Sequence, residues 1–333
     1  MLSEAFPEKT EEKTIMHLTQ EPKPTLAICL NPAWQKTLTF THLTHGEVNR
    51  AQKLVQCGGG KGVNVARVYR LFGWPITLAT FVGGETGRLL KGELLANGTT
   101  PLLQETVGVT RCCTTLISAD NHEVTEIIEP SATVSPQESA SLLEQSLAIV
   151  PNHGAVVFSG SMAPGVPKEF CAAVARQASA SGVPFVLDAV KDIDGALEAG
   201  VFVLKINASE LRQIAQKDEL TEAARVMLDR FPALANLAIT DGAKPAHLFT
   251  RQGNWRIVVP PLPGGVVSAI GGGDCTAAVL TRRIAEGACG EDLTEAFAEA
   301  LSCASASCLT EIPSVFELEQ AQHIRAQIQI CQE

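Results

Sequence analysis

Residues 155–216 read AVVFSGSMAPGVPKEFCAAVARQASASGVPFVLDAVKDIDGALEAGVFVLKINASELRQIAQ, and their pattern decides the fold. Short runs rich in β-branched and aromatic residues end at polar or glycine-bearing turns, and longer stretches typical of helices stand between them. Strands are expected at 155–158, 185–187 and 202–204, and helices at 168–179 and 209–216. This alternation predicts a parallel sheet with helices on both faces, which binds ligands where its strands end.

The same alternation extends over most of the chain. Further strands are expected at 25–30, 76–82 and 237–240, further helices at 63–72 and 137–149, and a nearly continuous helical region at 277–308. Together these elements predict one three-layer α/β/α domain over residues 25–333.

Two regions interrupt this rhythm. Residues 36–53 and 111–129 have alternating patterns rich in threonine and valine, which are typical of strands, and contain no helical stretch. We expect them to pair as a small second sheet that projects as a lid over the strand ends. Because exposed strand edges invite pairing, a homodimer through the lid is also expected.

The composition suits a globular enzyme. Of the 333 residues 45% are hydrophobic and 19% charged, and no apolar run approaches the roughly 18 residues of a membrane span. Residues 1–24 are charged, contain proline and lack the apolar core of a secretory signal, so we expect a disordered leader and a cytoplasmic location. The ten cysteines are scattered without a C-x-x-C spacing, so free thiols are expected rather than disulfides or a structural metal site.

The charge balance argues against a nucleic-acid partner. The chain has 26 Lys and Arg against 36 Asp and Glu, a net charge of −10, and only 5% of its residues are aromatic. Such a chain repels phosphate backbones and has few side chains for base stacking. A phosphorylated substrate would therefore need individual, locally placed Lys and Arg residues.

The sequence GGGDCT, residues 271–276, precedes an alanine-rich helix. Three glycines allow a tight turn whose N–H groups point outward, and the helix N-terminus adds partial positive charge, so the turn can hold a phosphoryl group. Asp274 at its end can take a proton from an attacking hydroxyl. Aspartate is also a common helix cap, so this motif alone leaves a purely structural interpretation open.

A second glycine run, CGGGKGVN at residues 57–64, also enters a helix. It is not a Walker A loop, because Gly62 follows Lys61 where serine or threonine is needed, and it does not match G-x-G-x-x-G. Its backbone can still approach a small ligand closely, with Lys61 and Asn64 available for polar contacts. A tight turn with a solvated Lys61 remains the alternative.

Taken together, the motifs resemble those of the pfkB, or ribokinase-like, family of carbohydrate kinases. The resemblance extends from about residue 26 over nearly the whole chain and is strongest to the phosphosugar branch of 1-phosphofructokinase and tagatose-6-phosphate kinase. The motifs occur in the expected order: Asn31-Pro32-Ala33, residues 46–50 (GEVNR), residues 58–64, Thr110-Arg111, Thr125-Glu126-Ile127, Ser159-Gly160-Ser161, Lys205-Ile206-Asn207 with Glu210, and residues 271–274.

The resemblance implies a ribokinase-like fold and roles for matching residues. Asp274 would be the general base and the N–H groups of Gly271, Gly272 and Gly273 the anion hole. The implied contacts with ATP come from Lys205, Asn207, Glu210, Thr240, Asp241 and Gly242, with Asn207 and Glu210 helping to place the Mg²⁺ on its phosphates. The implied substrate contacts are Lys61, Arg111 and Ser159 around the phosphate and Gly59 and Asn64 around the sugar.

Several residues depart from the family pattern. Gln35 stands where the family usually has an aspartate that accepts hydrogen bonds from sugar hydroxyls, and an amide can donate as well as accept. Gly272 replaces the usual alanine and Cys275 the usual serine, whereas Lys205-Ile206-Asn207 keeps both polar residues of Lys-Pro-Asn. Cys275 is expected to be a small packing residue rather than a reactive thiol.

The expected activity is ATP-dependent phosphorylation of a hexose phosphate. The family resemblance, not the chemistry of the residues, favours conversion of fructose 1-phosphate to fructose 1,6-bisphosphate. Tagatose-6-phosphate kinase, a kinase of another sugar, and a catalytically silent binding protein for a sugar phosphate or nucleotide remain alternatives, because of Gln35.

Overall fold

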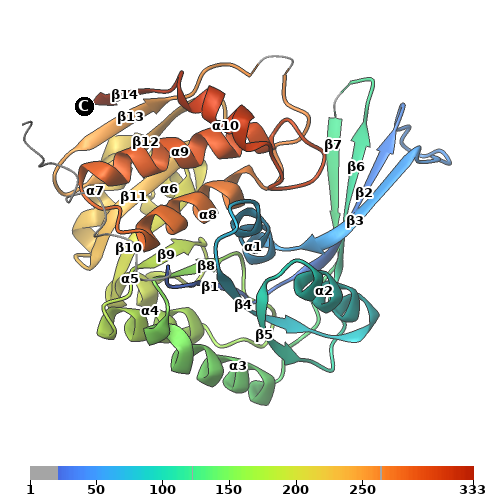
Figure 1. The fold of residues 1–333 in the computed structure, drawn as a ribbon, viewed down its shortest axis with the longest axis horizontal. Coiled ribbons are helices and arrows are strands. Elements are labelled where there is room, and N and C mark those ends of the chain that lie inside the picture. The colour runs from blue at the N-terminus through green and yellow to red at the C-terminus, as the bar shows by residue number, and fades with distance from the viewer. Residues whose placement is uncertain (1–21, 122, 263–264) are drawn as a thin grey trace, which may run out of the picture.

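The computed structural model describes residues 22–121, 123–262 and 265–333, and a ten-stranded sheet forms its centre (Figure 1). In spatial order the strands are β14 (Gln329–Gln332), β13 (Asn254–Val258), β12 (Lys244–Thr250), β11 (Leu234–Asp241), β10 (Val201–Asn207), β9 (Phe185–Asp188), β8 (Ala155–Ser159), β1 (Thr25–Cys29), β4 (Ile76–Val82) and β5 (Thr100–Glu105). The predicted parallel sheet is confirmed from β11 to β5. The antiparallel edge of β12, β13 and β14 differs from that prediction.

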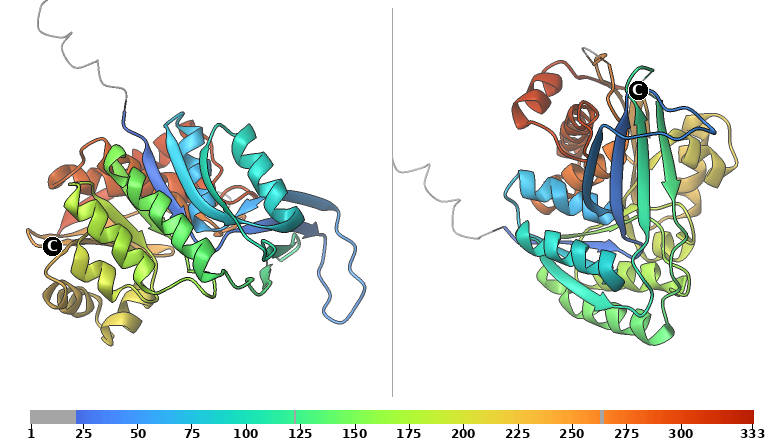
Figure 2. Two further views of the ribbon diagram at one scale, coloured as in Figure 1. Left: turned by 90° about the horizontal axis from the view of Figure 1, so that it is seen from below. Right: turned by 90° about the vertical axis from the view of Figure 1, so that its right-hand side faces the viewer.

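Helices cover both faces of this sheet (Figures 1 and 2). One layer contains α1 (Lys61–Leu71), α2 (Gly84–Ala96), α8 (Gly272–Ala285), α9 (Glu291–Ser307) and α10 (Leu318–Arg325). The other contains α3 (Pro136–Ile149), α4 (Glu169–Ala180), α5 (Asp194–Ala199), α6 (Ala208–Ala215) and α7 (Leu220–Arg230), with a short 3-10 turn at Val150–Asn152. The predicted three-layer α/β/α fold is therefore confirmed.

Strand β1 shows why helices must pack on both faces of the main sheet. Its side chains alternate, so that Ala27 and Cys29 belong to the core under α1 and α8, whereas Leu26 and Ile28 belong to the core under α3 and α4. A strand that is apolar on both sides is stable only when it is buried between two layers. None of the helices in the described part of the chain is long and apolar enough to cross a membrane.

A second sheet of four strands, the lid, projects from the domain (Figures 1 and 2). Its order is β3 (Lys53–Gly59), β2 (Ala33–Phe40), β6 (Cys112–Ser118) and β7 (Glu123–Ile128). The predicted range 111–129 contains β6 and β7. The predicted range 36–53 omits the first three residues of β2 and all but the first residue of β3. Strand β3 continues to Gly59 because it pairs with β2 along its whole length, from Thr39 opposite Lys53 to Ala33 opposite Gly59.

The predicted leader, residues 1–24, lies outside the described residues except for 22–24. That residues 25–333 form a single domain stays a prediction; strand β1 of the main sheet begins at Thr25.

Candidate active site

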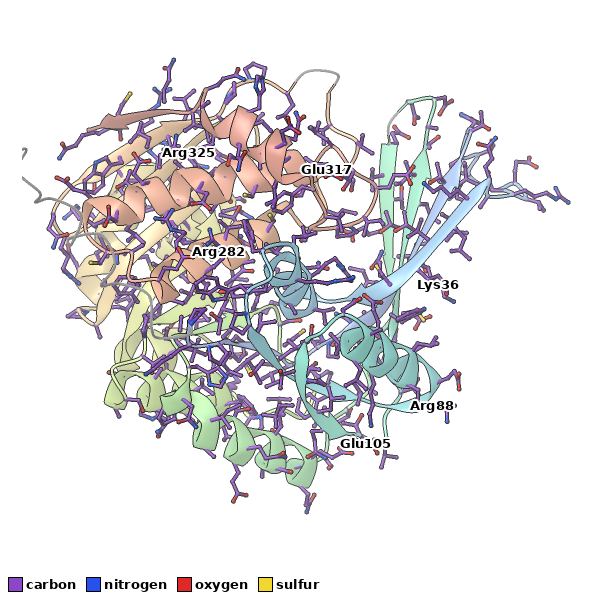
Figure 3. All side chains as sticks on the ribbon, viewed as in Figure 1. Lys36, Arg88, Glu105, Arg282, Glu317 and Arg325 are labelled. Carbon is purple, nitrogen blue, oxygen red and sulfur yellow. The ribbon has the colours of Figure 1, made fainter. Side chains whose placement is uncertain are left out.

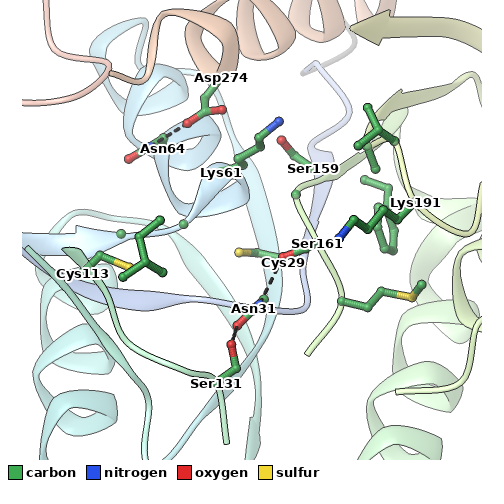
Figure 4. Close-up of a pocket in the computed structure, with 18 of the residues that line it drawn as sticks. Cys29, Asn31, Lys61, Asn64, Cys113, Ser131, Ser159, Ser161, Lys191 and Asp274 are labelled. Atoms are coloured by element: carbon green, nitrogen blue, oxygen red, sulfur yellow. Dashed lines mark hydrogen bonds between the residues drawn. The ribbon is translucent and has the colours of Figure 1, made fainter. Parts of the chain in front are cut away.

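A cavity of about 930 Å³ opens where the parallel strands end, between the main sheet and the lid (Figure 4). Its walls come from the turns after β1 and β8, the N-terminus of α1, the first residues of α8 and the inner face of the lid. Eight of the predicted site residues line it: Gly59, Lys61, Asn64, Arg111, Ser159, Glu210, Gly271 and Asp274. The cavity therefore gathers residues more than 200 positions apart in the sequence.

The glycine run is itself the beginning of helix α8. Gly271 caps the helix with φ of +83°, and Gly272, Gly273 and Asp274 form its first turn. The N–H groups of this turn have no carbonyl one turn earlier within the helix, and that of Gly272 reaches only the Ala269 carbonyl at 3.3 Å. The interpretation of Asp274 as a helix cap is thus wrong, since Gly271 has that place.

The loop after α9 explains why residue 271 must be glycine. A Cβ there would lie 2.8 Å from Pro313 Cβ and 2.9 Å from Ser314 Oγ, in addition to the strain of a positive φ. Ser314 also donates to the Gly271 carbonyl at 2.9 Å. This loop therefore packs closely against the turn and holds the Gly271 carbonyl through Ser314.

Asp274 is a buried carboxylate with one close donor. Asn64 Nδ2 donates to its Oδ2 at 2.7 Å (Figure 4). Burial, followed by the neighbouring carboxylate of Asp188, raises the pKa of Asp274, while Lys61, Asn64 and Lys205 counteract part of that rise. A carboxylate whose proton affinity is increased is better suited to act as a base.

Asp188 is the central charged group that the sequence analysis did not single out. It lies at the end of β9, fully buried, and accepts from Ser159 Oγ at 2.7 Å, Lys61 Nζ at 3.3 Å and Lys205 Nζ at 3.4 Å. Burial alone would raise the pKa of Asp188, but Lys205, Lys61 and Ser159 outweigh it and hold the pKa below its usual value. Its position at the carboxyl end of a predicted strand was the available signal.

The two lysines around Asp188 differ in exposure. Lys205 has a 5% exposed side chain and is held between Asp188 and Gly273, where a Cβ would lie 2.8 Å from its Nζ. Lys61 is 43% exposed, lines the cavity, and has its pKa raised chiefly by the charge of Asp188. Of these two lysines, Lys61 is therefore the one that can contact an anionic ligand in the cavity.

Arg111 is placed just before β6, at the base of the lid. Its Nη2 reaches only the Asn31 carbonyl, at 3.4 Å, and its buried Nε has no partner among the described residues. A buried guanidinium N–H without an acceptor is costly, so the site fits an anion that would supply one.

Gln35 lines the cavity from β2. Its Nε2 donates to Thr115 Oγ1 on β6 at 2.7 Å, which fixes the amide across the lid. Next to it, Gly59 packs closely, and a Cβ there would lie 3.1 Å from Gln35 Cβ. The departure at residue 35 therefore produces a defined contact within the lid.

Asn207 and Glu210 form a capping box at the start of α6. Asn207 Oδ1 accepts the Glu210 N–H at 2.9 Å, and Glu210 Oε2 accepts the Asn207 N–H at 2.8 Å. Glu210 lines the cavity, whereas Asn207 lies at the exposed end of β10, opposite Thr240 of β11. The pair thus has a structural role in addition to any role in binding.

Seven predicted site residues do not line the cavity: Gly272, Gly273, Lys205, Asn207, Thr240, Asp241 and Gly242. Gly272 and Gly273 lie in α8 between the lining residues Gly271 and Asp274, and Lys205 lies beside Asp188 and Gly273. The other four lie at the carboxyl ends of β10 and β11, and Asp241 is 3.9 Å from Lys244 across the following turn.

The donor set fits a magnesium ion carried by a nucleotide better than a tightly bound metal. No group of three metal-binding side chains is found among the described residues. Four carboxylates line the cavity, those of Glu126, Asp192, Glu210 and Asp274, and Mg²⁺ commonly uses one or two carboxylates together with phosphates and water.

Cys275 follows Asp274 but faces the core. Its side chain is fully buried, and burial raises the pKa of its thiol well above the usual value. The packing role expected from the sequence is consistent with this position, because a thiol is inert when it is not ionised.

Known structures share this architecture. Phosphofructokinase-2 from Escherichia coli, solved in complex with potassium, is 24% identical with a TM-score of 0.82, covering 91% of this chain and 98% of its own. A protein described as a possible 1-phosphofructokinase from Thermotoga maritima is 20% identical with a TM-score of 0.83, covering 93% and 99%. Ribokinase from Arabidopsis thaliana, solved with ribose and ATP, is 18% identical with a TM-score of 0.70, covering 91% and 98%.

At these identities the similarity establishes the ribokinase-like fold, and the sequence itself establishes the family. Residues 24–315 match the family described as pfkB family carbohydrate kinase, which is most of the chain. The protein is therefore a carbohydrate kinase that belongs to the pfkB family.

Proposed function

We propose that this kinase transfers the γ-phosphoryl group of ATP to a hydroxyl of a hexose phosphate, with Asp274 as the general base. The observation that carries the proposal is the placement of Asp274 in the first turn of α8. There its carboxylate lines the cavity beside backbone N–H groups that have no partner within the helix. A proton acceptor and an anion hole thus occupy one helix end, as transfer of a phosphoryl group requires.

In the proposed reaction Asp274 takes the proton of the acceptor hydroxyl as its oxygen bonds to the γ-phosphorus. The bond between that phosphorus and the bridging oxygen breaks, and ADP leaves. The N–H groups of Gly272 and Gly273 and the ammonium of Lys61 would face the developing negative charge. The nucleotide would lie toward Lys205, Asn207, Glu210, Thr240, Asp241 and Gly242. Magnesium bound with the nucleotide would neutralise phosphate charge near Glu210.

The cations of the cavity support a substrate that already carries phosphate. Arg111 has a buried Nε without an acceptor, and Lys61 and Ser159 lie at the same cavity. An unphosphorylated sugar would leave the Arg111 guanidinium without an anionic acceptor, whereas Lys61 already has Asp188 beside it. We favour fructose 1-phosphate on the family resemblance; fructose 6-phosphate is a second candidate, because the Escherichia coli enzyme was solved with it.

The proposal is tested by coupled measurement of ADP release with fructose 1-phosphate, fructose 6-phosphate, tagatose 6-phosphate, ribose and adenosine. Turnover is expected with a hexose phosphate and magnesium. Turnover of ribose or adenosine alone would contradict the phosphorylated substrate. A thermal shift with ligands but no turnover would favour a silent binding protein, the alternative that Gln35 suggests.

Replacing Arg111 with methionine is expected to raise the KM for the sugar phosphate about tenfold or more, since a charge-assisted hydrogen bond contributes roughly 1.5–3 kcal/mol. The KM for ATP should stay nearly constant, because Arg111 lies at the lid side of the cavity. Arg88→Met is the matched control: Arg88 points outward from α2 and pairs with Glu85 at the surface (Figure 3). Equal KM values for wild type and Arg111→Met would exclude a phosphate contact at this residue.

We also propose that two chains associate through their lids. Strands β3 and β7 are the edges of the lid sheet, and Leu54, Ile127 and Ile128 are each more than half exposed there. Light scattering at micromolar concentration is expected to give the mass of a dimer, and Ile127→Lys to give that of a monomer. Leu95→Lys, on the exposed side of α2, should not change the mass. The cytoplasmic location stays a prediction.

A further inference from the structure

A buried guanidinium lies behind the cavity without lining it. Arg67, in the middle of α1, has a side chain only 10% exposed. Its Nη1 donates to Asn64 Oδ1 at 2.6 Å and to the Pro313 carbonyl at 3.1 Å. Its Nη2 donates to the Gly58 carbonyl and lies 3.4 Å from Glu93 Oε1. All of these partners are acceptors, so both terminal nitrogens of the guanidinium are engaged.

This arrangement determines which way the Asn64 amide points. Arginine has only donors, so the atom of Asn64 that faces it must be the carbonyl oxygen. The amide nitrogen is thereby turned toward Asp274, to which it donates at 2.7 Å (Figure 4). With the amide reversed, its oxygen would face the carboxylate, and only a protonated Asp274 would be satisfied there.

The same guanidinium supports two other parts of the site. Arg67 and Glu93 together hold the Gly58 peptide group, since Glu93 accepts its N–H and Arg67 donates to its carbonyl. On the other side, the Pro313 carbonyl belongs to the loop that packs against Gly271. Arg67 thus connects the substrate-side turn, Asn64 and the loop behind the anion hole.

We propose that Arg67 is a positioning residue of the kinase reaction, which keeps the Asn64 amide turned so that Asp274 remains ionised and aimed at the acceptor hydroxyl. This inference rests on the proposed role of Asp274. The positioning role belongs to the series of side chains Glu93–Arg67–Asn64–Asp274. Each is joined to the next by a hydrogen bond or ion pair between buried or half-buried groups.

The groups around Asp274 predict in which direction its pKa should change when Arg67 is replaced. The charged and titratable groups that face it are Asp188, Lys61, Lys205 and the Cys29 thiol, and only Asn64 donates to it directly among the described side chains. If Asn64 loses its fixed orientation, the carboxylate loses that donor while burial and Asp188 remain. The pKa of Asp274 should then rise further.

The experiment compares wild type with Arg67→Met by two readouts. The first is the ¹³C carboxyl titration of Asp274, identified by its loss in Asp274→Asn, which needs no sugar substrate. The second is kcat against pH with the sugar phosphate that is turned over. Both the carboxyl pKa and the acid limb of kcat are expected to move up by about one unit, as the loss of a hydrogen bond to a charged group implies. On that limb kcat would be about tenfold lower, with the KM for ATP unchanged.

Two further variants sharpen the comparison. Arg70→Met, three residues along the same helix, removes an exposed arginine that bonds Asn97, and should move neither readout. Arg67→Lys keeps a charged donor for Asn64 but cannot hold all three carbonyl oxygens, so an intermediate shift is expected. If circular dichroism shows that Arg67→Met does not fold, Arg67→Lys is measured in its place.

An unmoved carboxyl titration in a folded Arg67 variant would overturn the inference, even if thermal stability fell, because a purely structural role predicts only the latter. The outcome is separable from that of the proposed function. A shifted titration in a protein that phosphorylates none of the sugars would support the effect of Arg67 on Asn64 and Asp274 but reject the proposed function. If the wild type phosphorylates a hexose phosphate but the Asp274 titration does not shift in the Arg67 variants, the proposed function stands and the role of Arg67 is rejected.

Discussion

Asp274→Asn is expected to lower kcat by about 10²–10⁴-fold, the range in which a general base contributes. Asparagine keeps the shape of the side chain and can still contact Asn64, so the cavity and its nucleotide end should persist. Binding of ATP, measured by calorimetry, is therefore expected to stay near the wild-type value. Asp194→Asn, in the first turn of α5 at the surface, is the matched control and should retain full activity.

Asp274→Asn should lower activity but is not expected to lower stability. Because burial and Asp188 raise the pKa of Asp274, its ionised form is disfavoured in the folded protein relative to the unfolded chain. Removing the charge should leave the melting temperature unchanged or higher at pH 7. In the wild type, kcat should fall as the pH drops through this raised pKa, since the base must be ionised. Wild-type turnover in Asp274→Asn would reject the mechanism.

Asp188→Asn is expected to lower the free energy of unfolding by roughly 3–5 kcal/mol, the cost of removing one partner from a buried ion pair. The reason is Lys205, whose side chain is 5% exposed and whose ammonium would lose its counter-charge. Lys61 is exposed enough to be solvated instead. The double variant Asp188→Asn/Lys205→Met should recover part of the loss, because no lone charge remains buried. Urea unfolding measures these differences.

At acidic pH the difference in free energy of unfolding between the wild type and Asp188→Asn should disappear. The pKa of Asp188 is held below its usual value in the folded protein, so its contribution to stability is present above about pH 4, the unfolded value, and is lost as the pH falls through the folded one. Glu222→Gln, which breaks a half-exposed pair with Lys217, should cost at most about 1 kcal/mol. A similarly small loss for Asp188→Asn would show that the buried charges are not coupled.

Local patterns were sufficient to predict most of the fold. The strand at 76–82 was placed at its observed bounds, and the helix at 137–149 within one residue, because hydrophobic period and turn residues are properties of a short window. Strand β3 was missed as a separate element. Its residues KLVQCGG contain few apolar side chains, and pairing with β2 rather than burial makes them a strand.

The antiparallel edge of the main sheet was missed for a related reason. Strands β12 and β13 follow β11 through short turns, and their direction is set by which neighbour they meet. Hydrophobic pattern alone does not distinguish a parallel from an antiparallel partner when the strand is half-buried.

The sequence by itself determined the order of the elements and the two glycine turns, and it singled out Asp274 as the candidate base, because each depends on residues that are neighbours in the chain. Only the tertiary structure decided that Asp274 is not the cap of its helix, that Asp188 contacts both Lys61 and Lys205, and that Arg67 donates to Asn64. These properties arise from burial and from contacts between distant segments. The energies of charges and hydrogen bonds depend on such surroundings, which a local pattern does not contain.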